Sequence, residues 1–192
     1  MGTLRPNFIV GIGGSAGALN AYTGLLDGLP SKTGMAFVFV YHVHPTANTQ
    51  LALILSRHTT MPVQLASNGM LIQANHVYVI PQDADLLIKD NAFKVVSPRT
   101  GRNKQIDLFL MSLAEAMGNR AIGIILSGYD GDGTAGCKHI KARGGTTFAQ
   151  DWSAEVNHMP LSAQGSGSID FVLPLDKSVK RLAKIGARVA QD

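Results

Sequence analysis

Short, almost continuously apolar runs alternate along the chain with stretches whose apolar residues recur at helical spacing. Residues 8–12, 36–41 and 121–126 form such runs, which are typical of strands buried on both faces of a parallel sheet. Residues 105–117 and 176–189 instead carry their apolar side chains on one stripe, which predicts amphipathic helices. This repeated strand–helix order predicts an α/β fold with a doubly wound, mostly parallel, Rossmann-like sheet.

Weaker signals complete this pattern. Asp176 is suited to the N-cap of the last helix, and Gly144 and Gly145 are expected to end an earlier one. The chain has no internal repeat and no linker-like stretch, which predicts a single domain over residues 1–192. The other predicted elements are helices over residues 16–26, 49–56, 134–143 and 159–164, and strands over residues 62–65, 146–149 and 171–173.

Residues 69–97 differ from the rest of the chain in the length and spacing of their apolar runs. Three short strand-like runs, at residues 76–80, 86–89 and 93–96, are separated by turn residues. Runs this short and closely spaced are typical of antiparallel pairing. We therefore predict an antiparallel hairpin inserted at the edge of the sheet, within the same domain.

The composition of the chain disfavours several classes of protein. The formal net charge is +4, with the basic residues spread along the chain, and only 6% of residues are aromatic. This composition disfavours nucleic-acid binding. No run approaches the roughly 18 apolar residues that cross a membrane, so no membrane insertion is expected. The single Cys137 indicates a reducing cytoplasm and is expected to be a packed helix residue.

The first apolar run ends in glycines around one serine. The segment GGSAG around Ser15 matches the G-x-S-x-G nucleophile elbow. An overlapping pattern, Gly11-x-Gly13-x-x-Ala16, is also compatible with a dinucleotide-binding turn. In either case the first backbone N–H groups of the next helix are unsatisfied there. Ser15 itself is open to two interpretations, a nucleophile or a helix N-cap.

Candidate partners for Ser15 follow two other predicted strands. His42 and His44 come after the second strand, and Asp130 and Asp132 come after a later one. Loops at the carboxyl ends of parallel strands meet at the topological switch point, where ligands bind. A serine hydroxyl needs a base, and the base needs a carboxylate that fixes its tautomer. The sequence therefore predicts a serine, a histidine and an aspartate in one crevice.

Each of these residues also has a simpler role. Asp132 is placed to cap the helix that begins near Thr134, and either histidine is compatible with a polar strand end. The two histidines with an aspartate form a possible metal-ligand set, but nothing fixes a third ligand. A calcium loop that starts at Asp130 needs a glutamate at its twelfth position, which is Lys141.

Other nucleotide and hydrolase classes fit less well. A dinucleotide fold needs an acidic residue at the end of the second strand, where this chain has Tyr41 and His42. A Walker A loop needs Gly-Lys-Ser/Thr after the glycines, and this is absent. An α/β-hydrolase runs serine, acid, histidine, whereas the order here is Ser15, His42, Asp132.

These residues, in this order, resemble the catalytic domain of the chemotaxis protein-glutamate methylesterase (CheB-type) family, over roughly residues 8–175. The most specific match is GIILSGYDGDGTAG at residues 123–136, which resembles the family's G-V-I-L-T-G-M-G-x-D-G-x-x-G. Further matches are IGGSAG at 12–17 with I-G-x-S-x-G, VYHVHP at 40–45 with Q-H-M-P, HVYVIP at 76–81 with H-x-Y-x-A-P, Ile106-Asp107 with the end of P-S-V-D, AQD at 149–151 and MP at 159–160.

The resemblance implies a serine hydrolase with Ser15 as nucleophile, His42 as general base and Asp132 as its orienting carboxylate. It implies the backbone amides of Tyr129 and Ala16 as oxyanion donors. The family hydrolyses glutamyl methyl esters of chemoreceptors, releasing methanol, and can deamidate glutamine. It uses no cofactor and no metal. The implied partner is a methylated, receptor-like signalling protein in the cytoplasm.

The sequence also departs from the family pattern. Ala16 and Ala18 stand where the family often has threonine and glycine, Tyr41 replaces a glutamine, and Asp130 replaces a glycine. His44 is the alternative base. The chain lacks the N-terminal receiver domain of typical members, which leaves room for a separate regulatory protein. Two other functions remain open: a non-catalytic signalling module that binds a partner or nucleotide at the glycine-rich crevice, and a general small-ester hydrolase.

Overall fold

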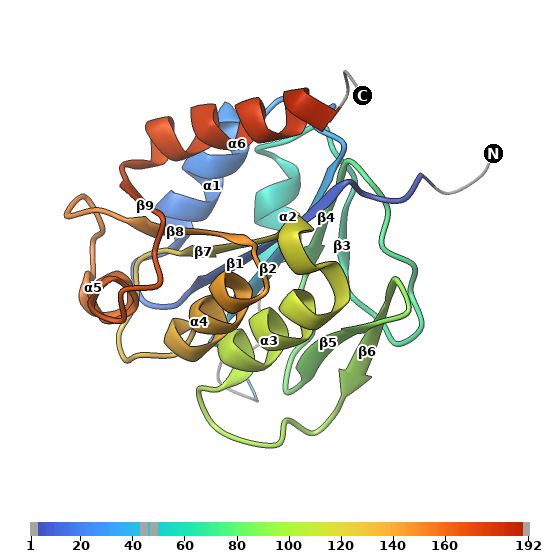
Figure 1. Cartoon of the computed structure of the whole chain (residues 1–192). Coiled ribbons are helices and arrows are strands. Elements are labelled where there is room, and N and C mark those ends of the chain that lie inside the picture. The colour runs from blue at the N-terminus through green and yellow to red at the C-terminus, as the bar shows by residue number, and fades with distance from the viewer. Residues whose placement is uncertain (1–3, 43–45, 47–49, 190–192) are drawn as a thin grey trace.

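The computed structural model of the chain describes residues 4–42, 46 and 50–189. Figure 1 shows a central twisted sheet with helices on both faces and a small hairpin beside it. The predicted α/β fold with a mostly parallel, doubly wound sheet is therefore confirmed.

Seven strands form the main sheet in the order β3-β4-β2-β1-β7-β8-β9. Every neighbouring pair in this sheet is parallel. The chain builds from β1 to one side and later from β7 to the other, so the topological switch point lies between β1 and β7. The strands are β1 (Phe8–Gly14), β2 (Met35–Tyr41), β3 (Val63–Leu65), β4 (His76–Val79), β7 (Ala121–Ile125), β8 (Thr146–Gln150) and β9 (Phe171–Leu173).

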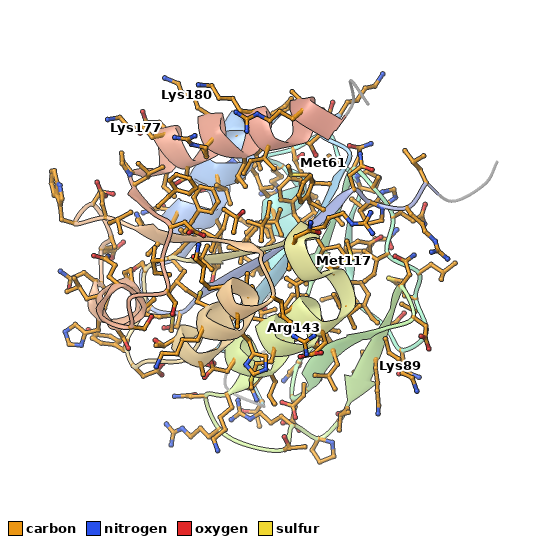
Figure 2. All side chains as sticks on the ribbon, viewed as in Figure 1. Met61, Lys89, Met117, Arg143, Lys177 and Lys180 are labelled. Carbon is orange, nitrogen blue, oxygen red and sulfur yellow. The ribbon has the colours of Figure 1, made fainter. Side chains whose placement is uncertain are left out.

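Two helical layers cover the sheet (Figure 1). One holds α1 (Leu19–Gly28), α2 (Leu51–Ser56) and α6 (Leu175–Val189), and the other holds α3 (Gln105–Met117), α4 (Thr134–Ala142) and α5 (His158–Gly165), with the short 3₁₀ helix η1 (Gly118–Arg120) after α3. Lys177 and Lys180 project from the outer face of α6 (Figure 2), so the basic tail is a solvated helix face. Among the described residues, no helix is long and apolar enough to cross a membrane.

Alternate side chains of β1 face the two layers. Ile9 packs in the cluster that contains the buried residues of α3, whereas Val10 and Ile12 pack in the cluster that contains those of α1. Gly13 faces α3, and a Cβ at this position would lie 2.5 Å from Ile106 Cγ2. The glycine therefore allows the first turn of α3 to lie directly against the end of β1.

The expected hairpin consists of β5 (Asp85–Lys89) and β6 (Ala92–Val96), which pair in antiparallel register as a separate two-stranded sheet. It packs against α3, where the Ile88 N–H donates to Ser112 Oγ at 3.1 Å. Leu86, Ile88 and Phe93 join the same buried cluster as the α3 side chains.

Three local expectations were wrong. β4 pairs in parallel with β2 and β3 inside the main sheet, because its central side chains are buried on both faces. α1 begins at Leu19 rather than at residue 16, since Gly17 adopts a φ of +71° that no helix continues. Asp176 lies within the first turn of α6 rather than before it.

Candidate active site

Two neighbouring strands deliver Ser15 and His42 to one edge of the sheet. Gly14 in β1 is the register partner of Tyr41 in β2, so Ser15 and His42 are the next residues on adjacent strands. Adjacent strands lie about 4.8 Å apart. The loop after β7 reaches the same edge from the other side, because the Ser15 N–H donates to Ser127 O at 2.9 Å.

His42 contacts Asp132, which this β7 loop supplies. His42 Nε2 lies 2.6 Å from Asp132 Oδ2, and the side chains are 11% and 0% exposed. Asp132 also accepts the backbone N–H of Ile106 at 3.0 Å and of Asp107 at 2.8 Å. Because this carboxylate is an acceptor in all three contacts, we assign the imidazole hydrogen to Nε2. Nδ1 is then the nitrogen with a free lone pair.

The start of α3 holds Asp132 in place. Ile106 and Asp107 lie in the first turn of α3, whose amides have no acceptor within the helix. Asp132 satisfies two of these amides and orients the imidazole with the same carboxylate. It does not cap α4, whose N-cap is Gly133 without a side-chain hydrogen bond.

The Ser15 hydroxyl oxygen accepts a hydrogen bond from a backbone amide. The Tyr129 N–H donates to Ser15 Oγ at 3.2 Å, and this is the amide that the sequence resemblance implies as an oxyanion donor. Within the described part of the chain, Ser15 Oγ makes no hydrogen bond to His42. Ser15 is not the cap of α1, since the N-cap is Ala18 without a side-chain hydrogen bond.

Gly128 leaves the space that the Ser15 hydroxyl occupies. A Cβ on this glycine would lie 2.6 Å from Ser15 Oγ and 2.9 Å from Met159 Cε. Its backbone is fixed on both sides, because the Gly128 N–H donates to Val156 O at 2.9 Å and the Met159 N–H donates to Gly128 O at 2.8 Å. The loop therefore cannot easily retreat from the serine.

Ser127 is a supporting residue that the sequence analysis did not single out. Its hydroxyl donates to Ala16 O at 2.8 Å and accepts the Val156 N–H at 2.9 Å, and its own N–H donates to Gln150 Oε1 at 3.2 Å. It thus ties the serine turn to the segment after β8. In one sequence the only signal for it is its place at the end of a buried strand.

Asp107 is a second supporting residue beside Asp132. Its Oδ1 accepts the backbone N–H of Gly133 at 2.9 Å and of Gly136 at 2.7 Å, which anchors the start of α4 to α3. Burial raises the pKa of Asp107, the Gly136 amide lowers it, and the Asp132 carboxylate raises it further. The result lies above the ordinary value.

The sequence also offered an alternative base, a cysteine and a possible metal site as functional candidates. His44 lies outside the described residues. Cys137 is buried in α4, where burial raises its thiol pKa to about 12, as fits a packed helix residue. Within the part of the chain that the structure describes, no group of three or more His, Cys, Asp and Glu side chains is arranged to hold a metal ion.

The serine lies near an open surface. The Tyr129 side chain is 57% exposed, and its ring contacts the His158 ring edge-on at a centroid distance of 5.5 Å. Trp152, in the segment after β8, is 87% exposed. Among the described residues, the loop that donates the Tyr129 amide to Ser15 therefore presents an exposed aromatic side chain at this edge of the sheet.

Comparison with known proteins decides the family. Residues 10–182 match a family model described as CheB methylesterase. The chain belongs to the CheB methylesterase family. It is accordingly a methylesterase, a carboxylic ester hydrolase of the chemotaxis class.

Individual members of the CheB methylesterase family match over most of the chain. A "putative protein-glutamate methylesterase/protein-glutamine glutaminase" of Leptospira interrogans is 35% identical over 170 residues, covering 86% of this chain and 88% of the relative. A "protein-glutamate methylesterase/protein-glutamine glutaminase 3" of Burkholderia orbicola is 34% identical over 194 residues and covers 95% of this chain, which spans only 54% of that protein. The solved Thermotoga maritima CheB methylesterase catalytic domain superposes with a TM-score of 0.84 at 28% identity, covering 93% of this chain and 98% of that domain.

Proposed function

We propose that this chain hydrolyses methyl esters on glutamyl side chains of a chemoreceptor-like protein. In this proposal Ser15 is the nucleophile, His42 the general base and Asp132 the carboxylate that orients it. The observation that carries the proposal is the 2.6 Å contact between His42 Nε2 and the buried Asp132, one strand away from a serine whose hydroxyl already contacts an amide. The descriptions of the relatives, methylesterase and glutaminase, support the substrate class.

The reaction begins with attack of Ser15 Oγ on the ester carbonyl carbon. Nδ1 of His42 takes the hydroxyl proton, because Nε2 already carries the hydrogen donated to Asp132. The Ser15 hydroxyl first turns from the Tyr129 amide toward Nδ1, a rearrangement in keeping with the looser hydrogen bonds of substrate-free active sites.

The tetrahedral intermediate places its oxyanion on backbone amides. The Tyr129 N–H, released by the serine hydroxyl, donates to this oxygen, and the Ala16 N–H is the second donor. Both are main-chain groups, so the replacement of the family's usual side chains at these positions leaves the donors in place.

Collapse of the intermediate breaks the bond between the carbonyl carbon and the methoxy oxygen. The departing oxygen takes the proton from Nδ1 and leaves as methanol, while the glutamyl group stays on Ser15 as an ester. Water then attacks this acyl-enzyme, gives a proton to Nδ1 and releases glutamate as Ser15 regains its hydrogen. A glutamine side chain passes through the same steps with ammonia as the leaving group.

We also propose which domain, partner and compartment the reaction involves. Residues 1–192 act as one catalytic domain, and the methylated receptor is the partner that reaches the open edge beside Tyr129. The reaction takes place in the cytoplasm, in keeping with the single buried thiol.

The experiment uses a chemoreceptor cytoplasmic fragment that carries isotopically labelled methyl esters, incubated with the purified chain. We expect release of labelled methanol, and of ammonia when glutamines stand at the same receptor positions. Absence of any turnover would favour a non-catalytic signalling module. Turnover of methyl acetate and p-nitrophenyl acetate at rates equal to the receptor fragment would instead favour a general small-ester hydrolase.

A further inference from the structure

Asp130 stands at a position where this chain departs from its family. The family motif that the sequence resembles has a glycine there, and Asp130 itself has a φ of +61°. Aspartate is one of the few residues other than glycine that adopt this left-handed conformation at modest cost. The turn between Tyr129 and Asp132 therefore carries a carboxylate at a left-handed position that aspartate tolerates.

Both carboxylate oxygens of Asp130 are held by neighbours. Oδ1 accepts the Asp132 N–H at 2.9 Å, and Oδ2 accepts Asn103 Nδ2 at 3.2 Å. Oδ2 also lies 3.5 Å from Nδ1 of His42. Because Nε2 of the same ring contacts the Asp132 carboxylate, the imidazole has a carboxylate beside each of its two nitrogens.

Among the described residues, the charged groups that contact His42 are carboxylates. Asp132 and Asp130 face it from the loop after β7, and Asp107 lies beside Asp132 at the start of α3. Beyond Tyr41, Asp83 is paired with Arg99 at 3.8 Å, so that carboxylate is already neutralised. His42 has a side chain that is 11% exposed, which limits screening by water.

We propose that Asp130 is a positioning residue, which holds His42 through the ring nitrogen that Asp132 leaves free. This inference rests on the proposed function. A protonated ring donates an N–H to each carboxylate and is held away from Ser15. A neutral ring presents its Nδ1 lone pair to the carboxylate, loses that contact and becomes available to the serine. Asp130 thereby restricts activity to higher pH than the glycine of the family allows.

The test compares the pH dependence of kcat/KM for wild type, Asp130→Asn and Asp130→Gly on the methylated receptor fragment. Asparagine keeps the left-handed backbone and an acceptor for the Asp132 N–H, and removes only the charge. We expect both variants to retain a larger fraction of their kcat/KM at acid pH than the wild type, because the carboxylate that holds the protonated ring is gone. An unmoved acid limb in both, or a shift with glycine alone, would overturn the proposal, because a loop effect rather than the charge would then be responsible.

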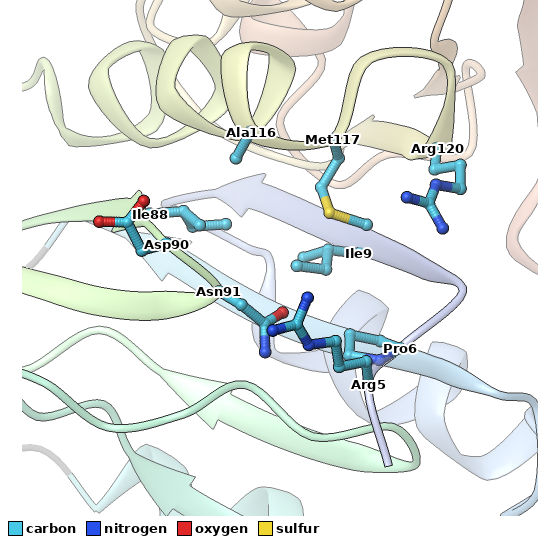
Figure 3. A pocket seen from close by; sticks show the side chains of 9 residues that line it. All are labelled: Arg5, Pro6, Ile9, Ile88, Asp90, Asn91, Ala116, Met117 and Arg120. Carbon is cyan, nitrogen blue, oxygen red and sulfur yellow. The ribbon is translucent and has the colours of Figure 1, made fainter. Parts of the chain in front are cut away.

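Asp90 provides a matched control. It is also an exposed aspartate with a positive φ, +53°, and lies at the far end of β1 beside a cavity of about 380 Å³ lined by Arg5, Met117 and Arg120 (Figure 3). Asp90→Asn removes the same charge far from His42. Its pH profile should superimpose on that of the wild type, and an equal shift in this variant would contradict a local role for Asp130.

A second readout separates the two proposals. NMR titration of the His42 ring, in a Ser15→Ala background with and without Asp130→Asn, follows the ring without any turnover. A lower titration midpoint in the double variant supports the role of Asp130 even if the wild type hydrolyses no methyl ester. Unchanged midpoints in an enzyme that does hydrolyse the ester would refute the role of Asp130 alone.

Discussion

Substitution of Gly128 by alanine tests the link between the serine hydroxyl and the Tyr129 amide. The added Cβ would lie 2.6 Å from Ser15 Oγ, which is 0.8 Å short of the 3.4 Å at which ordinary contact begins. The loop is fixed by its backbone bonds to Val156 and Met159, so the hydroxyl must move instead. From a starting distance of 3.2 Å, a displacement of this size takes Ser15 Oγ beyond hydrogen-bond range of the amide.

The same methyl group narrows the space in which the oxyanion would form. Loss of one oxyanion donor costs about 100-fold in rate, or about 2.7 kcal/mol in the activation barrier. We therefore expect kcat/KM for methanol release by Gly128→Ala to fall by about this factor. The flexible end of Met159 also has to shift, which should lower the stability by about 1–2 kcal/mol without unfolding the protein.

The assay is methanol release from the methylated receptor fragment, with circular dichroism and thermal melting as checks on the fold. Gly165→Ala is the matched control, because a Cβ at Gly165 in α5 meets nothing within 4 Å. This control should retain the wild-type rate. A Gly128→Ala rate within about twofold of the control would refute the argument that the added methyl group displaces the Ser15 hydroxyl and narrows the space for the oxyanion.

Three further outcomes follow from the same contacts. Asp132→Asn should lower kcat on the order of 10³–10⁴-fold in the methanol assay, because the amide no longer fixes the Nε2–H form of His42; a loss below tenfold would contradict its orienting role. Burial raises the pKa of Asp170, but the Lys141 ammonium and the Thr147 N–H outweigh it and leave the value below normal. This carboxylate therefore stabilises the fold above pH ~4 and ceases to as pH falls through its lowered pKa. The melting temperature of Asp170→Asn should thus lie below that of the wild type at pH 7, and the difference should shrink as the pH falls through this lowered pKa. Cys137 should resist iodoacetamide at pH 8 in the folded chain and react in urea, since its pKa is raised to about 12; rapid labelling of the folded chain would contradict its burial.

The strands around the switch point could be predicted from the sequence, because a strand buried on both faces consists of a continuous run of apolar residues. β1, β2 and β7 all contain such a run. The carboxyl ends of parallel strands in a doubly wound sheet lie at a common edge. The placement of Ser15 and His42 at neighbouring strand ends therefore needed no tertiary information. β4 was misassigned because its four residues are too short a run to distinguish a buried parallel strand from a hairpin strand.

The supporting contacts could not be predicted, since they join segments far apart in the chain. Asp132 bonds the amides of Ile106 and Asp107, 26 and 25 residues earlier, and not the nearby start of α4, where local sequence would place it as a cap. The closeness of α3 to β1 depends on Gly13, whose missing side chain leaves no periodic signal of its own. Ser127 braces the serine turn through hydrogen bonds to Ser15, Ala16, Gln150 and Val156, and none of these is a neighbour in sequence.

In the proposed mechanism Ser15 performs the hydrolysis, and its replacement by alanine is the decisive measurement. Release of labelled methanol from the receptor fragment is measured for wild type, Ser15→Ala and Ser31→Ala, where Ser31 is an exposed serine before β2. We predict a loss of at least 10³-fold in Ser15→Ala, with an unchanged melting curve, and the wild-type rate in Ser31→Ala. A folded Ser15→Ala variant that still releases methanol at a rate near that of the wild type would contradict this mechanism.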